Sequence, residues 1–400
     1  MKAVGSFSNL PESRFPNMTC PRVMPNVPQH GLRASIRDVF DPSSRAAGIA
    51  RVPSPALSLA SPAEAVAKPR PAPRTDDVQI LQITENERSR ILDLSLRVPS
   101  PYDDFEAHAS ASFQAVVSAL SPQNLAALRA FRTDARSPGA ILLRGLPTDP
   151  TLPATPSDGR RVQNKETFVS EACLSGVSQI IGDIYGYTTE KEGELIHNVC
   201  PVRKGEKTQS NESSKVDLSL HVENVYFDFR PDFVALYCLR QDHEKEAFTF
   251  TADARTALSM MRPEEIEELQ QPVFVTPSPP SHHAAQGGVQ WSRPRPLIDG
   301  PADAPELLMH LPDMKCLEPS IRGTFEKFKA AMNDGRTING VALQPGDLTI
   351  VNNRKAAHGR CFFTPRYDGT DRWLQRVYLH TNLWSARAVE TEQRRVYTEA

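Results

Sequence analysis

The segment Asp217-Leu-Ser-Leu-His-Val-Glu-Asn224 alternates apolar and polar side chains. A period of two predicts a β-strand with one buried face, because successive strand side chains point in opposite directions. The two leucines and the valine then share one face, and Ser219, His221 and Glu223 share the other. An imidazole and a carboxylate two residues apart on one rigid face can supply two of the three protein ligands of a non-haem iron(II) site.

Other short apolar runs predict further strands, and the chain shows no internal repeat. These strands are expected over residues 140–144, 233–239, 246–252, 272–276, 347–352 and 372–381. Helical composition is found at residues 84–95, at 110–133 with a start at Ser121-Pro122, at 166–184 with an end near Gly186, at 254–269 and at 319–333. Many short strands with a few outer helices predict a mainly β, α+β fold with a double-stranded β-helix, or jelly roll, at its core.

The first 75 residues differ in composition from the rest of the chain. They hold 12 of the 35 prolines, with many serines, alanines and arginines and no helical or strand period. Such a segment buries too little apolar surface to offset the entropy of ordering it. We therefore predict a disordered extension over residues 1–75, which resembles a transit peptide only weakly, and one jelly-roll domain over residues 76–400.

The overall composition favours a soluble, cytoplasmic protein. Lys and Arg number 46 against 48 Asp and Glu, so the net charge of −2 gives no argument for a nucleic-acid or anionic-membrane partner. No apolar run approaches the ~18 residues that span a bilayer. The six cysteines form no CxxC pair, which argues against a zinc ribbon and for reduced thiols. The composition does not indicate an oligomeric state.

His358 is the best placed of the ten histidines to complete an iron site. It follows the strand expected over residues 347–352, and the end of that strand can direct it back into a barrel. Three protein ligands leave adjacent positions on iron(II) for an oxo-acid and dioxygen. On these three residues alone, polar strand positions at His221 and Glu223 and a surface histidine at His358 remain the simpler alternative.

Two arginines on a later expected strand favour the interpretation of these residues as a metal site. Arg372 and Arg376 have the same parity, so they point to one face of the strand. The planar fork of arginine suits bidentate recognition of a carboxylate. Inward-pointing arginines are costly without anions, so two carboxylates, one on a co-substrate and one on a substrate, would satisfy them.

Several blocks of this sequence, in their order along the chain, resemble the clavaminate-synthase-like branch of the TauD-type iron(II)/2-oxoglutarate oxygenases, which includes amino-acid hydroxylases. The blocks are Gly139–Gly145, Gln209–Ser213, Leu220–Asn224, Arg230–Leu236, Arg240–Glu244, Gly346–Asn352, His358 and Asp371–Arg376. The resemblance implies a jelly-roll fold and the use of iron(II), 2-oxoglutarate and dioxygen.

The resemblance also implies which residues hold the metal and the co-substrate. His221, Glu223 and His358 are expected to bind iron(II). Arg372 is expected to pair with the distal carboxylate of 2-oxoglutarate, and Thr249 is expected to help hold that carboxylate. The presence of Glu223 argues against halogenation, because related halogenases lack this carboxylate.

The substrate residues follow from the same resemblance. Arg376 occupies a position that contacts the α-carboxylate of the amino acid, and Gln209, Ser210 and Asn211 belong to a loop that borders its amino and carboxylate groups. A cationic side chain is expected to meet acidic residues of the segment 303–313, namely Asp303, Glu306 and Asp313.

The predicted activity is hydroxylation of a free L-amino acid, of the lysine, arginine or asparagine type, at an unactivated carbon. An alternative within the enzymes is a TauD-like dioxygenase that acts on another small acid or on a carrier-bound aminoacyl group. The non-enzymatic alternative is a catalytically inert jelly-roll binding module. Such a module would have no reason to keep three metal ligands together with Arg372.

Overall fold

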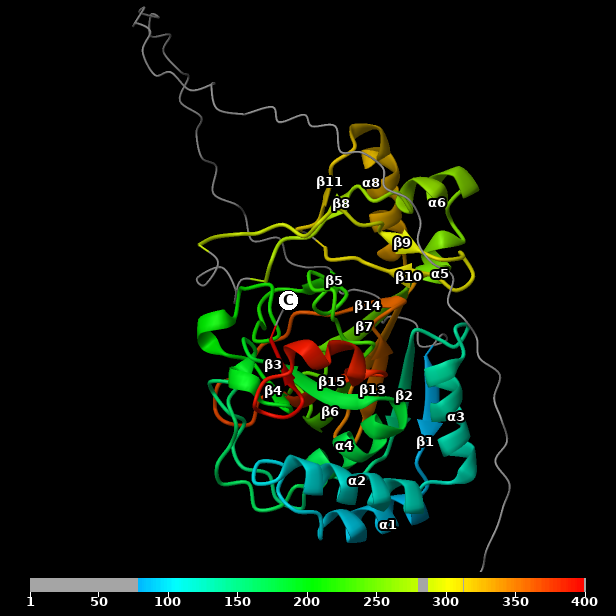
Figure 1. The fold of residues 1–400 in the computed structure, drawn as a ribbon. Coiled ribbons are helices and arrows are strands. Elements are labelled where there is room, and N and C mark those ends of the chain that lie inside the picture. The colour runs from blue at the N-terminus through cyan, green and yellow to red at the C-terminus, as the bar shows by residue number, and fades with distance from the viewer. Residues whose placement is uncertain (1–77, 280–286, 312, 399–400) are drawn as a thin grey trace, which may run out of the picture. The chain divides into compact units, whose positions relative to one another are not determined.

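The computed structural model describes residues 78–279, 287–311 and 313–398 (Figure 1). The chain divides into two units, Met1–Ala67 and Lys68–Ala400, and all described residues belong to the second. The extension predicted over residues 1–75 lies outside the described residues. Within the described part, no helix is both long and apolar enough to cross a membrane.

A larger, mostly antiparallel sheet forms one wall of the fold. Its strand order is β1-β2-β13-β6-β15-β3-β16, and β4 also pairs with β15. The central strands β6 and β15 are buried along almost their whole length, because one face meets helices and the other faces the second sheet. The strands are β1 (Gln79–Gln82), β2 (Ala140–Arg144), β3 (Asp183–Tyr187), β4 (His197–Val199), β6 (Phe233–Arg240), β13 (Leu348–Asn352), β15 (Trp373–His380) and β16 (Val396–Tyr397).

A smaller antiparallel sheet, of order β12-β7-β14-β5, forms the other wall. Two further strand pairs, β8 with β11 and β9 with β10, lie beyond it (Figure 1). The strands are β5 (Leu218–His221), β7 (Phe248–Asp253), β8 (Phe274–Val275), β9 (Ile298–Asp299), β10 (Glu306–Leu307), β11 (Lys315–Cys316), β12 (Ile338–Ala342) and β14 (Ala356–Arg360). The two walls form a jelly roll with flanking helices, which confirms the predicted fold class.

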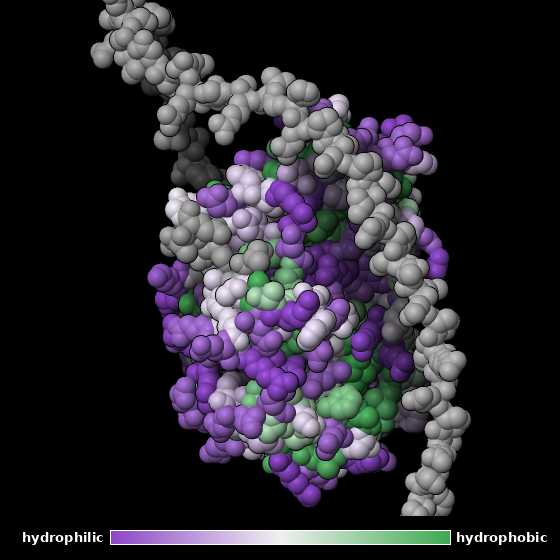
Figure 2. Space-filling model, viewed as in Figure 1, coloured by the Kyte–Doolittle hydropathy of each residue, from purple (hydrophilic) through white to green (hydrophobic). Residues whose placement is uncertain are grey.

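Helices cover the outer face of each sheet. Apolar residues of α1 to α4 pack with the larger sheet in one core, and residues of α5, α6 and α8 pack with the smaller sheet in another (Figure 1). Hydrophilic side chains cover most of the face shown in Figure 2. The helices are α1 (Glu85–Ser95), α2 (Phe105–Ala119), α3 (Pro122–Thr133), α4 (Val169–Ile181), α5 (Ala254–Leu258), α6 (Pro263–Leu269) and α8 (Arg322–Met332), with short 3-10 turns at Lys191–Gly193, Arg203–Gly205, Pro319–Ile321 and Leu383–Val389.

The packing of α4 on α2 requires a glycine. A Cβ atom at Gly176 would collide with the carbonyl of Ser112 and the side chain of Val116. This close approach brings the almost fully buried α4 against β6 and β15. The outer face of β15, which carries Trp373 and Val377, therefore belongs to the core, and its inner face is left for the site.

Several predicted helix boundaries differ from the structure, and each difference has a local cause. The helical segment expected over 110–133 is two helices, and the start predicted at Ser121-Pro122 is confirmed, because Ser121 caps a new helix that has Pro122 in its first turn. The helix expected over 254–269 is also divided, with Pro263 in the first turn of α6. The helix expected to end near Gly186 ends at Ile181, because the next residues pair with β15 as β3.

Candidate metal centre and substrate cavity

A cavity of about 980 Å³ lies between the two sheets. Its smaller-sheet wall includes His221 from β5, Thr249 from β7 and His358 from β14. Its larger-sheet wall includes Leu374 and Arg376 from β15. Because strand side chains alternate between faces, β15 supplies the cavity with one set and the helix-facing core with the other.

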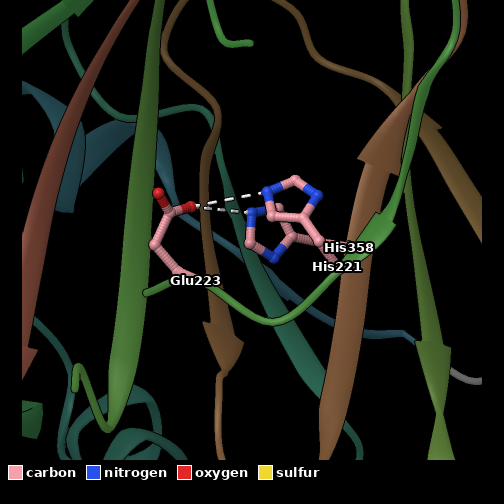
Figure 3. Close-up of side chains that lie close together, drawn as sticks. All are labelled: His221, Glu223 and His358. Atoms are coloured by element: carbon pink, nitrogen blue, oxygen red, sulfur yellow. Dashed lines mark ion pairs between the residues drawn. The ribbon is translucent and has the colours of Figure 1, made fainter. Parts of the chain in front are cut away.

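The cavity brings His221, Glu223 and His358 together (Figure 3). The Oε2 atom of Glu223 lies 3.6 Å from Nε2 of His221 and 3.4 Å from Nε2 of His358. The two histidines face each other because β14 pairs with β5 in a register that places His358 opposite His221. Two predictions about the backbone were wrong. Glu223 lies in a turn after β5 rather than on the strand. His358 follows β13 in the sequence but lies within a separate strand, β14, so the end of β13 does not direct it.

Hydrogen bonds fix the side chain of His221 and the backbone of Glu223. Nδ1 of His221 lies 2.8 Å from the carbonyl of Ser219. A carbonyl only accepts, so Nδ1 carries the proton and Nε2 presents its lone pair to the centre. The backbone of Glu223 is fixed by Asn353, which accepts from its N–H at 2.8 Å and donates to its carbonyl at 3.1 Å.

The carboxylate of Glu223 has different surroundings at its two oxygens. Oε1 accepts hydrogen bonds from Nη1 of Arg376 at 3.0 Å and from the Tyr378 hydroxyl at 2.8 Å, and Oε2 faces the histidines. Burial alone would raise the pKa of Glu223, but Arg376 and the two histidines hold it well below its usual value. Two imidazole nitrogens and one ionised carboxylate oxygen on one side of a cavity suit an iron(II) ion with three open positions.

Arg372 and Thr249 lie together at another part of the cavity wall. Arg372 is buried, and its Nη2 donates to Oγ1 of Thr249 at 3.3 Å. Burial lowers the pKa of Arg372. Among the described residues, no carboxylate forms an ion pair with Arg372. An anionic ligand would give this buried guanidinium the counter-charge that the described residues do not supply.

Arg376 points into the cavity as predicted from strand parity, but it has protein partners. Besides Glu223, its Nη2 lies 3.2 Å from Oε2 of Glu190 and 3.0 Å from Nδ1 of His197. The Tyr378 hydroxyl lies 2.8 Å from the same Glu190 oxygen, so its single proton is shared between Glu190 and Glu223. Burial raises the pKa of Glu190, while Arg376 opposes that rise. Burial and then Arg376 lower the pKa of His197 to about 3, so His197 is neutral and accepts from the guanidinium.

The loop predicted to border the substrate does line the cavity, through Gln209, Ser210 and Asn211. The amide of Gln209 bonds to strand backbone, since it donates to the carbonyl of Asp217 at 2.9 Å and accepts from the N–H of Ser219 at 3.1 Å. The hydroxyl of Ser210 is 2.8 Å from that of Thr208. Gln209 therefore anchors the loop to β5, which leaves Asn211 as the more available polar side chain.

Only one of the three acidic residues expected near the substrate reaches the cavity. Asp313 lines the cavity wall, although its side chain is exposed. Asp303 pairs with an exposed arginine on the surface, at 2.7 Å. Glu306 pairs with two arginines, at 2.8 and 2.9 Å. The expectation of an acidic cluster around a cationic side chain was therefore wrong for Asp303 and Glu306.

Comparison with known proteins assigns the family. The family model described as "Taurine catabolism dioxygenase TauD, TfdA family" matches residues 100–378. The chain belongs to this family. This TauD-family chain is 38% identical to an L-asparagine oxygenase of Streptomyces coelicolor over 66% of its own length and 77% of that relative. It is 32% identical to clavaminate synthase 2 of Streptomyces clavuligerus over 74% of its own length and 90% of that relative.

A solved structure is similar over most of the TauD-family chain. An asparagine oxygenase in complex with Fe(II), 2S,3S-3-hydroxyasparagine and succinate is 33% identical, with a TM-score of 0.72. The match covers 80% of this chain and 99% of that structure. The clavaminate-synthase-like resemblance predicted from the sequence blocks is confirmed.

Sequence reasoning missed several cavity residues of this TauD-family chain, and two of them are polar groups near the proposed site. Glu190 follows β3 in a polar stretch with no periodicity, so no local signal marks it. His310 lines the cavity with its ring centroid 6.1 Å from that of His221. Its buried Nδ1 has no hydrogen-bond partner among the described residues, and burial lowers its pKa to about 4. The bridge between His310 and His221, which are far apart in sequence, brings His310 to the cavity.

Proposed function

We propose that this chain is an iron(II)- and 2-oxoglutarate-dependent dioxygenase that hydroxylates a free L-amino acid at an unactivated carbon. The observation that carries the proposal is the convergence of His221, Glu223 and His358 in a cavity that also holds the unneutralised Arg372. Relatives named as amino-acid oxygenases and hydroxylases support it.

In this proposal, Nε2 of His221, Nε2 of His358 and Oε2 of Glu223 hold the iron. When bound, iron(II) activates dioxygen and couples the oxidative decarboxylation of 2-oxoglutarate, to succinate and carbon dioxide, to hydroxylation of the substrate. The protein sets the geometry of this chemistry. The proton on Nδ1 of His221 fixes the ring orientation, and Arg376 and Tyr378 restrict Glu223 to one metal-facing oxygen.

Arg372 and Thr249 receive the distal carboxylate of 2-oxoglutarate. A charge-assisted pair with a fork-shaped donor fixes both the position and the orientation of a carboxylate. The site is favourable for the anion because Arg372 is already desolvated, so binding adds a counter-charge without burying a further cation.

Arg376 and Glu190 suit the two charges of an α-amino acid. A zwitterion can give its carboxylate to Arg376 and its ammonium to Glu190, so that each buried charge keeps a partner after the present Arg376–Glu190 contact opens. Asn211 offers a further polar group in the wall of the same cavity. A small acid without an amino group would draw Arg376 away from Glu190 and supply no cation in its place, which favours an amino acid over the alternative acids. A carrier-bound aminoacyl group has no free carboxylate, so its ammonium would take Glu190 from Arg376 without offering the guanidinium a new anion in exchange.

Asp313 and His310 form the wall that side-chain atoms of the substrate would meet. Asp313 accepts hydrogen bonds from a cationic or amide group, and a neutral imidazole either donates or accepts one. One carboxylate beside one neutral imidazole suits the amide of asparagine as well as the cations of lysine and arginine.

The deciding experiment measures succinate release with each of the twenty L-amino acids under air. Asparagine, lysine or arginine is expected to raise succinate release well above the substrate-free level. The matched control omits the amino group, as the 2-hydroxy acid of the same side chain, and it should stimulate poorly. If only a sulfonate or a carrier-bound aminoacyl group stimulates, the substrate assignment is wrong. A protein that consumes no 2-oxoglutarate with any compound would instead be a binding module.

A further inference from the structure

Arg360 is a buried cation that the proposed reaction does not use. It ends β14, it lies opposite Thr249 in the pairing with β7, and it lines the cavity. Its side chain and that of Arg372 flank the same ring, with guanidinium carbons 4.9 and 5.8 Å from the centroid of Phe363. Among the described residues, neither arginine forms an ion pair with a carboxylate. Two buried positive charges therefore share one end of the cavity.

The hydrogen bonds of Arg360 go to neutral groups of a single loop. Nη1 donates to the carbonyl of Ser213 at 2.6 Å, and Nη2 donates to the Ser213 hydroxyl at 2.8 Å. A longer contact of 3.5 Å reaches the carbonyl of Val216. These acceptors orient the guanidinium without cancelling its charge.

The same loop forms the wall of the amino-acid end of the cavity. Ser213 is fully buried, and its hydroxyl donates to the carbonyl of Ser210 at 2.8 Å. Ser210 and Asn211 line the cavity directly. Arg360, Ser213 and Ser210 thus connect the cationic end of the cavity with the wall that faces the substrate.

We propose that Arg360 is a positioning residue that couples 2-oxoglutarate binding to the order of the loop Gln209–Val216. This inference rests on the proposed function, which places the distal carboxylate beside Arg372. The negative charge of that carboxylate relieves the repulsion between Arg360 and Arg372 and holds Arg360 in place. Arg360 then holds Ser213, so the substrate wall becomes ordered after the co-substrate has bound.

The test combines calorimetry with hydrogen–deuterium exchange on the iron(II)-loaded protein without oxygen, so that no turnover occurs. In the wild type, 2-oxoglutarate is expected to slow amide exchange in residues 206–216. In Arg360→Met, the Kd for 2-oxoglutarate should rise roughly tenfold, because one nearby charge is lost in a medium of low effective dielectric. The slowing of exchange in the loop should also disappear. Arg366→Gln is the matched control, since Arg366 is exposed and pairs with Glu244 on the surface.

A second variant separates the coupling from the charge. Ser213→Ala keeps both arginines but removes the hydroxyl between Arg360 and Ser210. It should change the Kd for 2-oxoglutarate less than threefold while weakening the ligand-induced protection of residues 206–216. Full protection in both Arg360→Met and Ser213→Ala would overturn the coupling and leave the proposed function intact. A wild type that binds no 2-oxoglutarate would overturn both.

Discussion

The strand backbone holds the two histidines of the proposed iron site in place, so their positions do not depend on contacts of their side chains. His358 and His221 are paired through the strand backbone, and Nδ1 of His358 has no hydrogen-bond partner among the described residues. His358→Ala and His221→Ala should therefore abolish iron binding and leave the fold intact. Iron content per chain and the thermal unfolding midpoint, measured on the same samples, test both statements. Full 2-oxoglutarate-dependent turnover in either variant would show that the ligand assignment is wrong.

Substitution of the two arginines of the β15 region should impair the binding of different substrates. Arg372→Ala removes the cation proposed for 2-oxoglutarate and should raise its KM on the order of a hundredfold, since loss of a buried charge partner costs a few kcal/mol. Arg376→Ala should raise the KM of the amino acid by a similar factor. Because Arg376 also holds Oε1 of Glu223, this variant should bind iron more weakly as well. Equal effects of both variants on both substrates would contradict this division.

At the scale of helices, Glu87 joins α1 to α3. Its carboxylate accepts from the N–H of Thr84 at 2.8 Å, which completes the capping box of α1. It also accepts from the N–H of Ser121 at 2.7 Å and from the amide of Asn124 at 3.0 Å, at the start of α3. Burial opposes its ionisation, but the hydrogen bonds from Thr84 and Ser121 lower the pKa of Glu87 to about 2.

The low pKa of Glu87 predicts a pH-dependent stability. A carboxylate whose pKa falls on folding stabilises the folded state above its unfolded pKa of 4.5, and this contribution is lost as the pH falls towards 2. Glu87→Gln should lower the free energy of unfolding by up to about 3 kcal/mol at neutral pH. The wild type and the variant should converge in urea titrations between pH 4.5 and 2. Glu85→Gln, at an exposed position of the same helix turn, is the control and should change little.

Elements that depend on local signals were predictable, and those that depend on distant partners were not. The strand over 140–144 is present as β2, and the helix over 84–95 is present as α1, because a bounded apolar run and a helix cap are signals that act within a few residues. β3 was missed because a mixed segment after a helix becomes a strand only by pairing with β15. β14 was missed for the same reason, since its short Ala-Ala-His-Gly-Arg sequence has no strong strand period.

The residues of the site also divide into those with a local sequence signal and those that only the whole fold brings together. His221, Glu223, His358 and Arg372 stand in recognisable blocks, so their convergence could be expected. Glu190 could not, because only the pairing of β3 and β4 with β15 brings it to Arg376. Sequence alone also could not show that Asp303 and Glu306 pair with arginines elsewhere.

The start of the ordered fold gives a prediction for the whole chain. β1 pairs in parallel with β2, beginning with Gln79 opposite Ile141. A chain that begins at residue 76 keeps this strand and should retain its stability and its activity. A chain that begins at residue 84 lacks β1 and the buried Leu81, so its thermal unfolding midpoint should fall. Loss of activity in the first chain, despite normal unfolding, would assign a functional role to residues 1–75.

The double use of Glu223 has a thermodynamic consequence. One oxygen faces the histidines while the other is held by Arg376, the proposed partner of the amino acid. Iron and amino acid therefore act on opposite ends of one carboxylate, and their affinities must be reciprocal: whatever factor the amino acid imposes on the Kd of iron, iron imposes on the Kd of the amino acid. Four anaerobic titrations test this equality: iron with and without the amino acid, and the amino acid with and without iron. In Tyr378→Phe, which removes the second bond to the same oxygen, the shared factor should change.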